Sequence, residues 1–188
     1  MGLFDKFKKA THAAGPEKLS PVDAEEAHDV LCAPCSGKIV AMTEVPDPVF
    51  GNEVLGKGCA IWPDEGVIYA PVSGKVTVTM GHAIGVAAPE DPAVGVKSES
   101  GIEILIHVGI DTVEMGGTGF TTLVNAEAEV KAGDPILSFD RKAIKDAGHP
   151  DIAVMAVSNT DDFADVEMLV GSQSAVRAGQ AVVRVQPK

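Results

Sequence analysis

The clearest alternation of apolar and polar side chains in this chain runs from residue 101 to residue 113. Because side chains of a β-strand point alternately to opposite faces, every second residue belongs to the same face. One face is wholly aliphatic and consists of Ile102, Ile104, Ile106, Val108 and Ile110. The opposite face displays His107, with Gly109 beside it. The pattern predicts a strand that buries its aliphatic face and presents an imidazole on the other.

Asp111 shares the face of His107, four residues further along the chain. Four residues of straight strand span about 13 Å, so Asp111 approaches His107 only if the chain bends, which Gly109 permits. A lone histidine on a strand is weak evidence of function, and a side chain that simply faces water is the alternative.

The rest of the chain past residue 28 reads as short strands separated by Gly, Pro, Asp and Asn. One such run, 74–78, leads into Thr79, Met80, Gly81 and His82. The best helical signal is 140–147, which Gly148 closes, and 161–169 is a weaker one. This pattern predicts an all-β fold, an antiparallel β-sandwich or barrel-sandwich hybrid with short helical turns.

Two sequence elements occur twice. Residues 33–40 match 70–77, with the shared pattern Ala-Pro-x-Ser-Gly-Lys, and residues 130–136 match 176–182. A strand–turn unit used twice fits a barrel-sandwich of related halves. Similar elements occur in biotinyl and lipoyl carrier domains, but no lysine stands in a suitable hairpin context, so that similarity concerns the fold alone.

Composition and charge narrow the function classes. The 188 residues suit one domain with a tail, and the formal net charge of −12 argues against nucleic acid and for basic protein partners. No apolar run reaches the roughly 18 residues of a membrane helix. Few cysteines and no recognisable leader favour a reducing, cytoplasmic location.

The first 20 residues are basic although the whole chain is acidic. Leu3, Phe4, Phe7 and Ala10 fall at helical spacing opposite lysines. This predicts that residues 2–10 touch an anionic membrane surface weakly, at the inner face of the membrane, with a frayed soluble terminus as the alternative. Residues 11–25 read as linker, so 1–25 is expected to be tail and linker and 26–188 the domain.

Two short motifs imitate known sites. Cys32 and Cys35 form a C-x-x-C pair, but the repeat aligns them with Tyr69 and Val72, which are ordinary packing positions. Packing is therefore the preferred interpretation over a redox or zinc site. The run 51–57 nearly spells a P-loop but lacks the Ser or Thr that holds magnesium.

The segments quoted above resemble a known family, the glucose-type enzyme IIA component of the bacterial sugar phosphotransferase system. Residues 101–113 carry most of the resemblance, followed by Gly117-x-Gly119-Phe120 and Gly81-His82-Ala83. Shorter matches lie at 45–50, 56–61 and 70–74. The resemblance runs over essentially the whole chain.

The resemblance implies a phosphocarrier. His107 would accept a phosphoryl group on Nε2 from the phosphocarrier protein HPr and pass it to a membrane-bound IIB domain during sugar uptake, with His82 supporting it. No organic cofactor is implied. Two histidines are a weak metal site, so zinc is expected at His82 and His107 only when a partner adds a carboxylate, as in one regulatory complex of this family.

The family also presents an apolar docking patch ringed by acids. The matching apolar positions are Val49, Phe50, Val78, Ile84 and Leu105, and the acids are Asp47 and Asp111. Core packing is the alternative for each apolar residue. Leu105 shares the face of His107, and Phe50 is expected to be exposed because it lies in a proline-rich loop.

Two features depart from the family. Met80 stands where a threonine usually precedes the first histidine, and 87–96 reads as an insertion that lengthens a hairpin. The imported sugar is open, because glucose, N-acetylglucosamine, sucrose, maltose and β-glucoside systems share this domain type. A monomer is expected.

Two other function classes remain open. One is a regulatory protein that binds permeases or metabolic enzymes with phosphorylation as its switch, and the other is a carrier-like structural domain without transfer activity.

Overall fold

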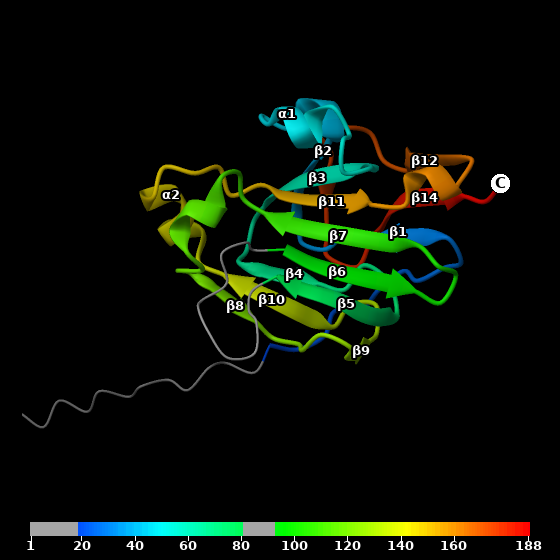
Figure 1. Ribbon diagram of the computed structural model, residues 1–188, viewed down its shortest axis with the longest axis horizontal. Helices are drawn as coiled ribbons and strands as arrows, with labels where there is room; N and C mark the ends of the chain where they lie inside the picture. Colours follow the sequence, from blue (N-terminus) through cyan, green and yellow to red (C-terminus); the bar gives the residue numbers. More distant parts are fainter. Residues whose placement is uncertain (1–18, 81–92) are drawn as a thin grey trace, which may run out of the picture.

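Strand β7 lies near the middle of the largest sheet, between β11 and β6 (Figure 1). This computed structural model describes residues 19–80 and 93–188, without the side chains of residues 78–80. Within them the large sheet has the order β13-β2-β3-β11-β7-β6-β5-β9, and two smaller sheets have the orders β4-β10-β8 and β1-β14-β12. All pairings are antiparallel. The predicted all-β class is confirmed.

The strands are β1 (Val30–Cys32), β2 (Gly37–Ala41), β3 (Lys57–Pro63), β4 (Val67–Tyr69), β5 (Gly74–Met80), β6 (Ala93–Ser98), β7 (Glu103–Val108), β8 (Phe120–Thr122), β9 (Glu129–Val130), β10 (Pro135–Phe139), β11 (Ala153–Val157), β12 (Asp165–Met168), β13 (Ala175–Val176) and β14 (Ala181–Gln186). The helices are α1 (Pro48–Gly51) and α2 (Arg141–Asp146), with the 3₁₀ turns η1 (Met42–Glu44), η2 (Thr112–Met115) and η3 (Thr160–Asp162). No helix among them is long and apolar enough to cross a membrane.

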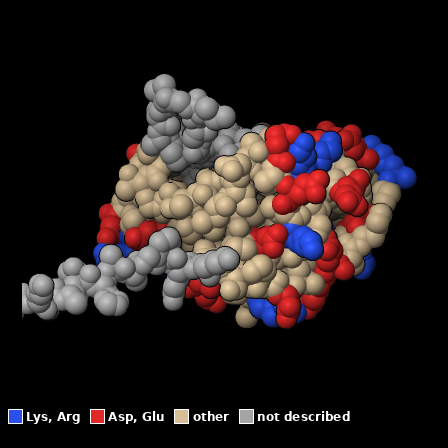
Figure 2. Space-filling model, turned by 90° about the horizontal axis from the view of Figure 1, so that it is seen from below, with Lys and Arg blue, Asp and Glu red and all other residues tan. Residues whose placement is uncertain are grey.

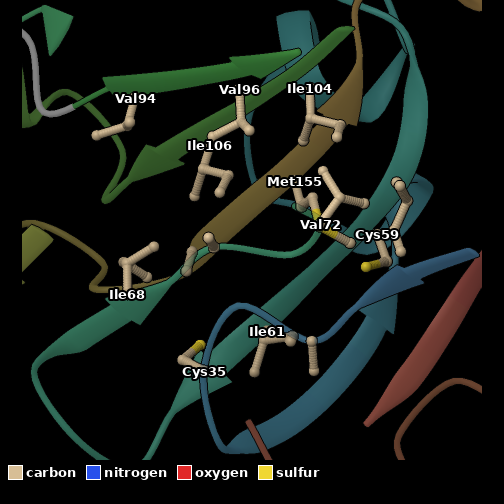
Figure 3. Close-up of a cluster of buried hydrophobic side chains, with 14 of the residues drawn as sticks. Cys35, Cys59, Ile61, Ile68, Val72, Val94, Val96, Ile104, Ile106 and Met155 are labelled. Carbon is tan, nitrogen blue, oxygen red and sulfur yellow. The ribbon is translucent and has the colours of Figure 1, made fainter. Parts of the chain in front are cut away.

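The main core lies between the large sheet and the two smaller ones. It takes Ile104 and Ile106 from β7, Ile68 from β4 and Ile136 from β10, all exposed by 2% or less. Figure 3 shows side chains of β6, β7 and β11 directed toward Ile68 and the side chains of β3. The aliphatic face of β7 is therefore buried in the main core, as the alternation in the sequence predicted.

A second, smaller core lies on the opposite face of the large sheet. Here η1 and α1 cover β2, β3 and β11 (Figure 1). Its members are Val40, Met42, Val45, Phe50, Ala60, Ile110, Ile152, Val154 and Ala156. Ile110 belongs to this core rather than the main one, because β7 ends at Val108 and the chain turns before residue 110.

The repeated elements form equivalent contacts. The N–H of Tyr69 donates to the carbonyl of Pro34 at 2.8 Å, and the N–H of Cys32 donates to the carbonyl of Pro71 at 2.8 Å. Each repeat therefore holds the other in the same way. The pairing continues at the sheet edges, where Gly37 lies opposite Val176 and Gly74 opposite Val130.

One predicted helix is present and the other is wrong. Asp140 caps α2, since its carboxylate accepts from the N–H groups of Lys142 and Ala143. The weaker candidate, 161–169, is the single turn η3 followed by strand β12. Pairing with β14 over four residues, which buries Val166, outweighs the local helical signal there.

Part of the predicted linker packs against the domain. The N–H of Val22 donates to the carbonyl of Gly133 at 3.0 Å, and that of Glu25 donates to the carbonyl of Gly179 at 2.7 Å. Gly133 and Gly179 occupy equivalent positions in the second repeated element. Residues 19–25 therefore form a strap across both copies.

The three cysteines are free and buried, which supports the packing interpretation of the C-x-x-C pair. Burial raises the pKa of the Cys32 thiol to about 11 and that of Cys59 to about 12. Burial also raises the pKa of Cys35.

We expect replacement of Gly133 by alanine to weaken the strap. A Cβ at Gly133 would meet the carbonyl oxygen of Val22 at 2.2 Å, and its φ is +88°. Gly148 has the same φ of +88° but nothing within 4 Å, so Gly148→Ala is a matched control for backbone strain. Urea unfolding should show both variants destabilised, with Gly133→Ala losing about 1–2 kcal/mol more. Equal losses would contradict the strap contact.

The raised thiol pKa values predict low reactivity in the folded state. At pH 8, Ellman's reagent should leave the native cysteines unmodified and should label them after unfolding in guanidinium chloride. Unfolded thiols ionise near their ordinary pKa of 9.0, whereas folded Cys32 and Cys59 stay protonated up to about 11 and 12. The unfolded state therefore binds fewer protons in this range, and unfolding free energy should fall as pH rises above about 9. Rapid labelling of the folded protein at pH 8 would contradict the predicted low reactivity of the thiols.

Candidate functional site

His107 lies on the face of β7 that is turned away from the main core. Its backbone pairs with Val154 of β11 and Ala93 of β6. Leu105, two residues earlier, is flanked in the same way by Ala156 and Gly95. Directly paired residues share a face, so His107 and Leu105 stand among small neighbours on both sides. Both side chains are half-buried, as the alternation predicted.

The atoms of the His107 imidazole differ in their exposure to solvent. Its Nδ1 atom is buried, although the residue as a whole is only half-buried. The exposed part of the ring therefore lies elsewhere than Nδ1. Of the two ring nitrogens, Nδ1 is therefore the one that solvent does not reach.

Phe50 lies against the imidazole. The two ring centroids are 5.2 Å apart and the planes are tilted by 49°. Phe50 is only 8% exposed, so the expectation that it is exposed is wrong. Pro48 and the capping carboxylate of Asp47 begin helix α1, and this helix turns Phe50 into the second core beside His107. Helix α1 was not predicted from the sequence.

Asp47 and Val49 also lie on α1. The carboxylate of Asp47 accepts from the N–H groups of Val49 at 2.8 Å and Phe50 at 3.0 Å, which makes it a helix cap. Val49 is 42% exposed and points away from the second core. The position of Asp47 thus has a structural explanation, whereas Val49 leaves an apolar side chain in solvent.

The chain bends at Gly109, just after β7 ends. The sequence predicted that Asp111 could approach the imidazole only if such a bend were present. Gly109 has a φ of +82° and Asp111 has a left-handed conformation with φ of 56°. The N–H of Gly109 donates to the carbonyl of Ile152 at 2.8 Å, and that of Ile110 donates to the carbonyl of Pro150 at 3.1 Å. Asp111 precedes η2, is exposed, and forms no side-chain cap on it.

Two functional features of this bend were missed by sequence reasoning. Thr112 is fully buried and its hydroxyl donates to the carbonyl of Val108 at 2.7 Å, which locks the bend. Val113, next in the chain, is 48% exposed and adds apolar surface beside Asp111. Both residues belong to the segment that carries the family resemblance, but the strand alternation gives neither a structural role, and only the bend after β7 shows one.

Several predicted residues lie outside the described part of the chain. His82 and Ile84 fall in 81–92, and the side chain of Val78 is also outside it. The predicted insertion 87–96 lies partly outside, but residues 93–96 begin strand β6 and pair with β5 and β7. These four residues are thus sheet rather than an inserted loop. Among the described residues, no three His, Cys, Asp or Glu side chains form a metal site.

Charge is unevenly distributed on the face seen in Figure 2. Most Lys, Arg, Asp and Glu side chains gather toward the right of the view, the side on which β9 and the β6–β7 turn lie in Figure 1. The centre is uncharged. Strand β7 starts on this charged side and ends on the left in Figure 1. His107, the second-last residue of β7, therefore lies at the end of the strand that is away from the charged side.

Comparison with known proteins shows the family to which this chain belongs. The EIIA 1 family of the phosphoenolpyruvate-dependent sugar phosphotransferase system matches residues 29–163. The chain is similar to the PTS system glucose-specific EIIA component of Bacillus cereus, with 36% identity over 172 residues, 92% of this chain and 99% of that protein.

Two further relatives extend the comparison. The PTS system mannose-specific EIIBCA component of Corynebacterium glutamicum is 37% identical over 167 residues, which cover 88% of this chain but 22% of that longer protein. The solved structure of glucose permease IIA from Mycoplasma capricolum matches with a TM-score of 0.65 and 33% identity, over 82% of this chain and 93% of that chain. The family match and these relatives show that this chain belongs to the EIIA 1 family and is a component of the sugar phosphotransferase system.

Proposed function

We propose that this protein is a phosphocarrier that accepts a phosphoryl group on Nε2 of His107 from phospho-HPr and donates it to a IIB domain for sugar uptake. The observation that carries the proposal is the half-buried imidazole at the outer face of β7, with Nδ1 buried, in a chain of the EIIA 1 family. The reaction needs no organic cofactor, since the imidazole is itself the nucleophile.

The chemistry suits a neutral imidazole. In its neutral form, an imidazole carries a proton on one ring nitrogen and a free lone pair on the other. That lone pair attacks phosphorus, a new N–P bond forms, and the bond between phosphorus and the donor protein breaks. The transferring group resembles metaphosphate, so positioning and charge stabilisation supply most of the catalysis.

Phe50 and the bend supply positioning. The phenyl ring at 5.2 Å restricts rotation of the imidazole, and the ladder of β7 with β11 and β6 fixes its backbone. His82 is proposed, from the family resemblance, to donate an N–H to the phosphoryl oxygens. Zinc at His82 and His107 would need a carboxylate from a partner.

Docking would use the apolar surface around His107. Val49, Leu105 and Val113 supply exposed or half-exposed apolar area, and the exposed Asp111 supplies an acid at the bend after β7. Val78 and Ile84 remain proposed members of this surface. A net charge of −12 favours a basic donor protein such as HPr.

The acceptor is proposed from the fused relative. The Corynebacterium glutamicum protein is named EIIBCA, which puts an EIIA region in one chain with EIIB and EIIC. A IIB domain is therefore the natural acceptor, and sugar specificity is proposed to lie with the membrane component. The unphosphorylated surface is also available to regulatory partners, with phosphorylation of His107 as the switch.

The decisive experiment replaces His107 by glutamine. Incubation with phosphoenolpyruvate, enzyme I and HPr should add one phosphoryl group to the wild type, seen by intact mass and mapped to His107 under alkaline conditions. His107→Gln should accept none, yet should still bind HPr, because the docking surface is intact. His28→Gln is a control, because His28 is exposed and lies near Glu99 and Ser100 of the β6–β7 turn, at the other end of β7 from His107. Phosphorylation of a folded His107→Gln protein, or none of the wild type, would overturn the proposal.

Neutralising Asp111 should weaken docking without slowing the chemical step. Asp111→Asn removes one exposed charge beside the site, so the KM for phospho-HPr should rise about two- to fivefold at low salt, with kcat little changed. The increase should shrink at high ionic strength. Glu99→Gln, an exposed acid in the β6–β7 turn, is the matched control and should leave KM unchanged. An equal effect of both variants would mean that only net charge matters.

A further inference from the structure

Asp151 is a charged residue in an unusual place. Among the described residues, only Asp151 and Thr112 are polar or charged and buried, and Asp151 is 4% exposed. A carboxylate is costly to bury unless it is paired and hydrogen-bonded. Nothing in the phosphoryl-transfer chemistry above uses this residue, so its burial needs another explanation.

Two cations of α2 neutralise the carboxylate. The Nε of Arg141 lies 2.7 Å from Oδ2 of Asp151, and the Nζ of Lys145 lies 3.4 Å from the same oxygen. Arg141 and Lys145 are four residues apart, hence on one face of the helix. Arg141 also donates from Nη1 to the carbonyl of Asp64 at 2.6 Å. The ion pair thus ties the segment before β11 to α2 and to the β3–β4 turn.

The residues on both sides of Asp151 hold the bend that follows His107. The carbonyl of Pro150 accepts from the N–H of Ile110, and the carbonyl of Ile152 accepts from the N–H of Gly109. Asp151 is therefore anchored to α2 through its side chain. Its two neighbours, Pro150 and Ile152, hold the backbone of the bend that follows His107.

The segment before β11 is also held by the fully buried side chain of Ile152 in the second core, and by the N–H of His149, which donates to the carbonyl of Ile144 at 3.1 Å. In Figure 1, α2 lies at the same end of the molecule as the end of β7 and the start of β11. His149 contributes a longer contact, with its Nε2 3.9 Å from Oε2 of Glu114 in η2. Among the described residues, the part-buried pair of Asp151 and Arg141 is the shortest ion pair of this segment.

We propose that Asp151, held by Arg141, is a positioning residue for phosphoryl transfer at His107. It keeps the carbonyls of Pro150 and Ile152 in place, these fix Gly109 and Ile110, and the fixed bend sets the end of β7 and Asp111 around the imidazole. The inference rests on the proposed function of His107. Asp151 does not contact the reacting atoms, but its loss should measurably slow phosphoryl transfer.

The test compares Asp151→Asn, Arg141→Gln and the double variant in single-turnover transfer from phospho-HPr. Loosening a site by a fraction of an ångström costs rate rather than binding, so Asp151→Asn should slow transfer about tenfold or more. Its affinity for HPr should change less than about twofold, as for a substitution away from the docking surface. If Asp151 acts through Arg141, the double variant should be no slower than either single variant.

A stability control separates positioning from general weakening. Val183→Ala removes methyl groups from a fully buried residue of β14, in a different sheet from β7. It should destabilise the fold yet leave the transfer rate within about twofold of wild type. Hydrogen exchange gives a second readout, since the amides of Gly109 and Ile110 should exchange about tenfold faster in Asp151→Asn and not in Val183→Ala.

Each outcome decides the inference. Transfer and exchange in Asp151→Asn within about twofold of wild type would overturn it, as would a slowing that Val183→Ala reproduces. If Asp151→Asn does not fold, Arg141→Gln carries the same test through the other member of the pair. Wild-type protein that takes no phosphoryl group on His107 would instead refute the proposed function. The exchange rates would then still decide whether Asp151 holds the bend.

Discussion

The structure depends on one reciprocal exchange of backbone hydrogen bonds. Pro34 accepts from Tyr69, and Pro71 accepts from Cys32, each at 2.8 Å, between two copies of the same sequence element. A proline cannot donate but its carbonyl accepts freely, and each copy supplies what the other needs. Strands β2 and β5 both start from these elements, so the exchange sets where the two halves of the large sheet begin. The strap of residues 19–25 crosses the matching pair of turns at Gly133 and Gly179.

This arrangement explains why a reactive imidazole can sit on a rigid support. Strand β7 has a paired neighbour on each side and a sealed aliphatic face beneath it, so its backbone has little freedom. A side chain on such a strand is held more precisely than one on a loop. Where the strand stops, the chain is held by Thr112, by the carbonyls of Pro150 and Ile152, and by the ion pair of Asp151 and Arg141. In the part of the chain that the structure describes, the site therefore lies at a strand end that these contacts hold.

The successes and failures of sequence reasoning have identifiable causes. The alternation through residues 102–108 fixes which side chains are buried, because a one-residue shift in register would expose every isoleucine. It was less reliable for Ile110, which left the strand and joined the second core. Phe50 was misjudged because a proline-rich stretch looks like an exposed loop, whereas Asp47 and Pro48 together start a helix. The segment 161–169 was misjudged because only β14 makes it a strand.

By itself the sequence determined the all-β class, the buried face of β7, the outward direction of His107 and the family resemblance. These follow from local periodicity and from motifs that are contiguous in the chain. Only the tertiary structure decided that Phe50 contacts the imidazole, that Thr112 locks the bend and that Asp151 is anchored to α2. Phe50 contacts a residue far away in the chain, and Asp151 depends on where α2 packs. Thr112 bonds to Val108 only four residues earlier, but across a bend that the alternation of the strand does not show.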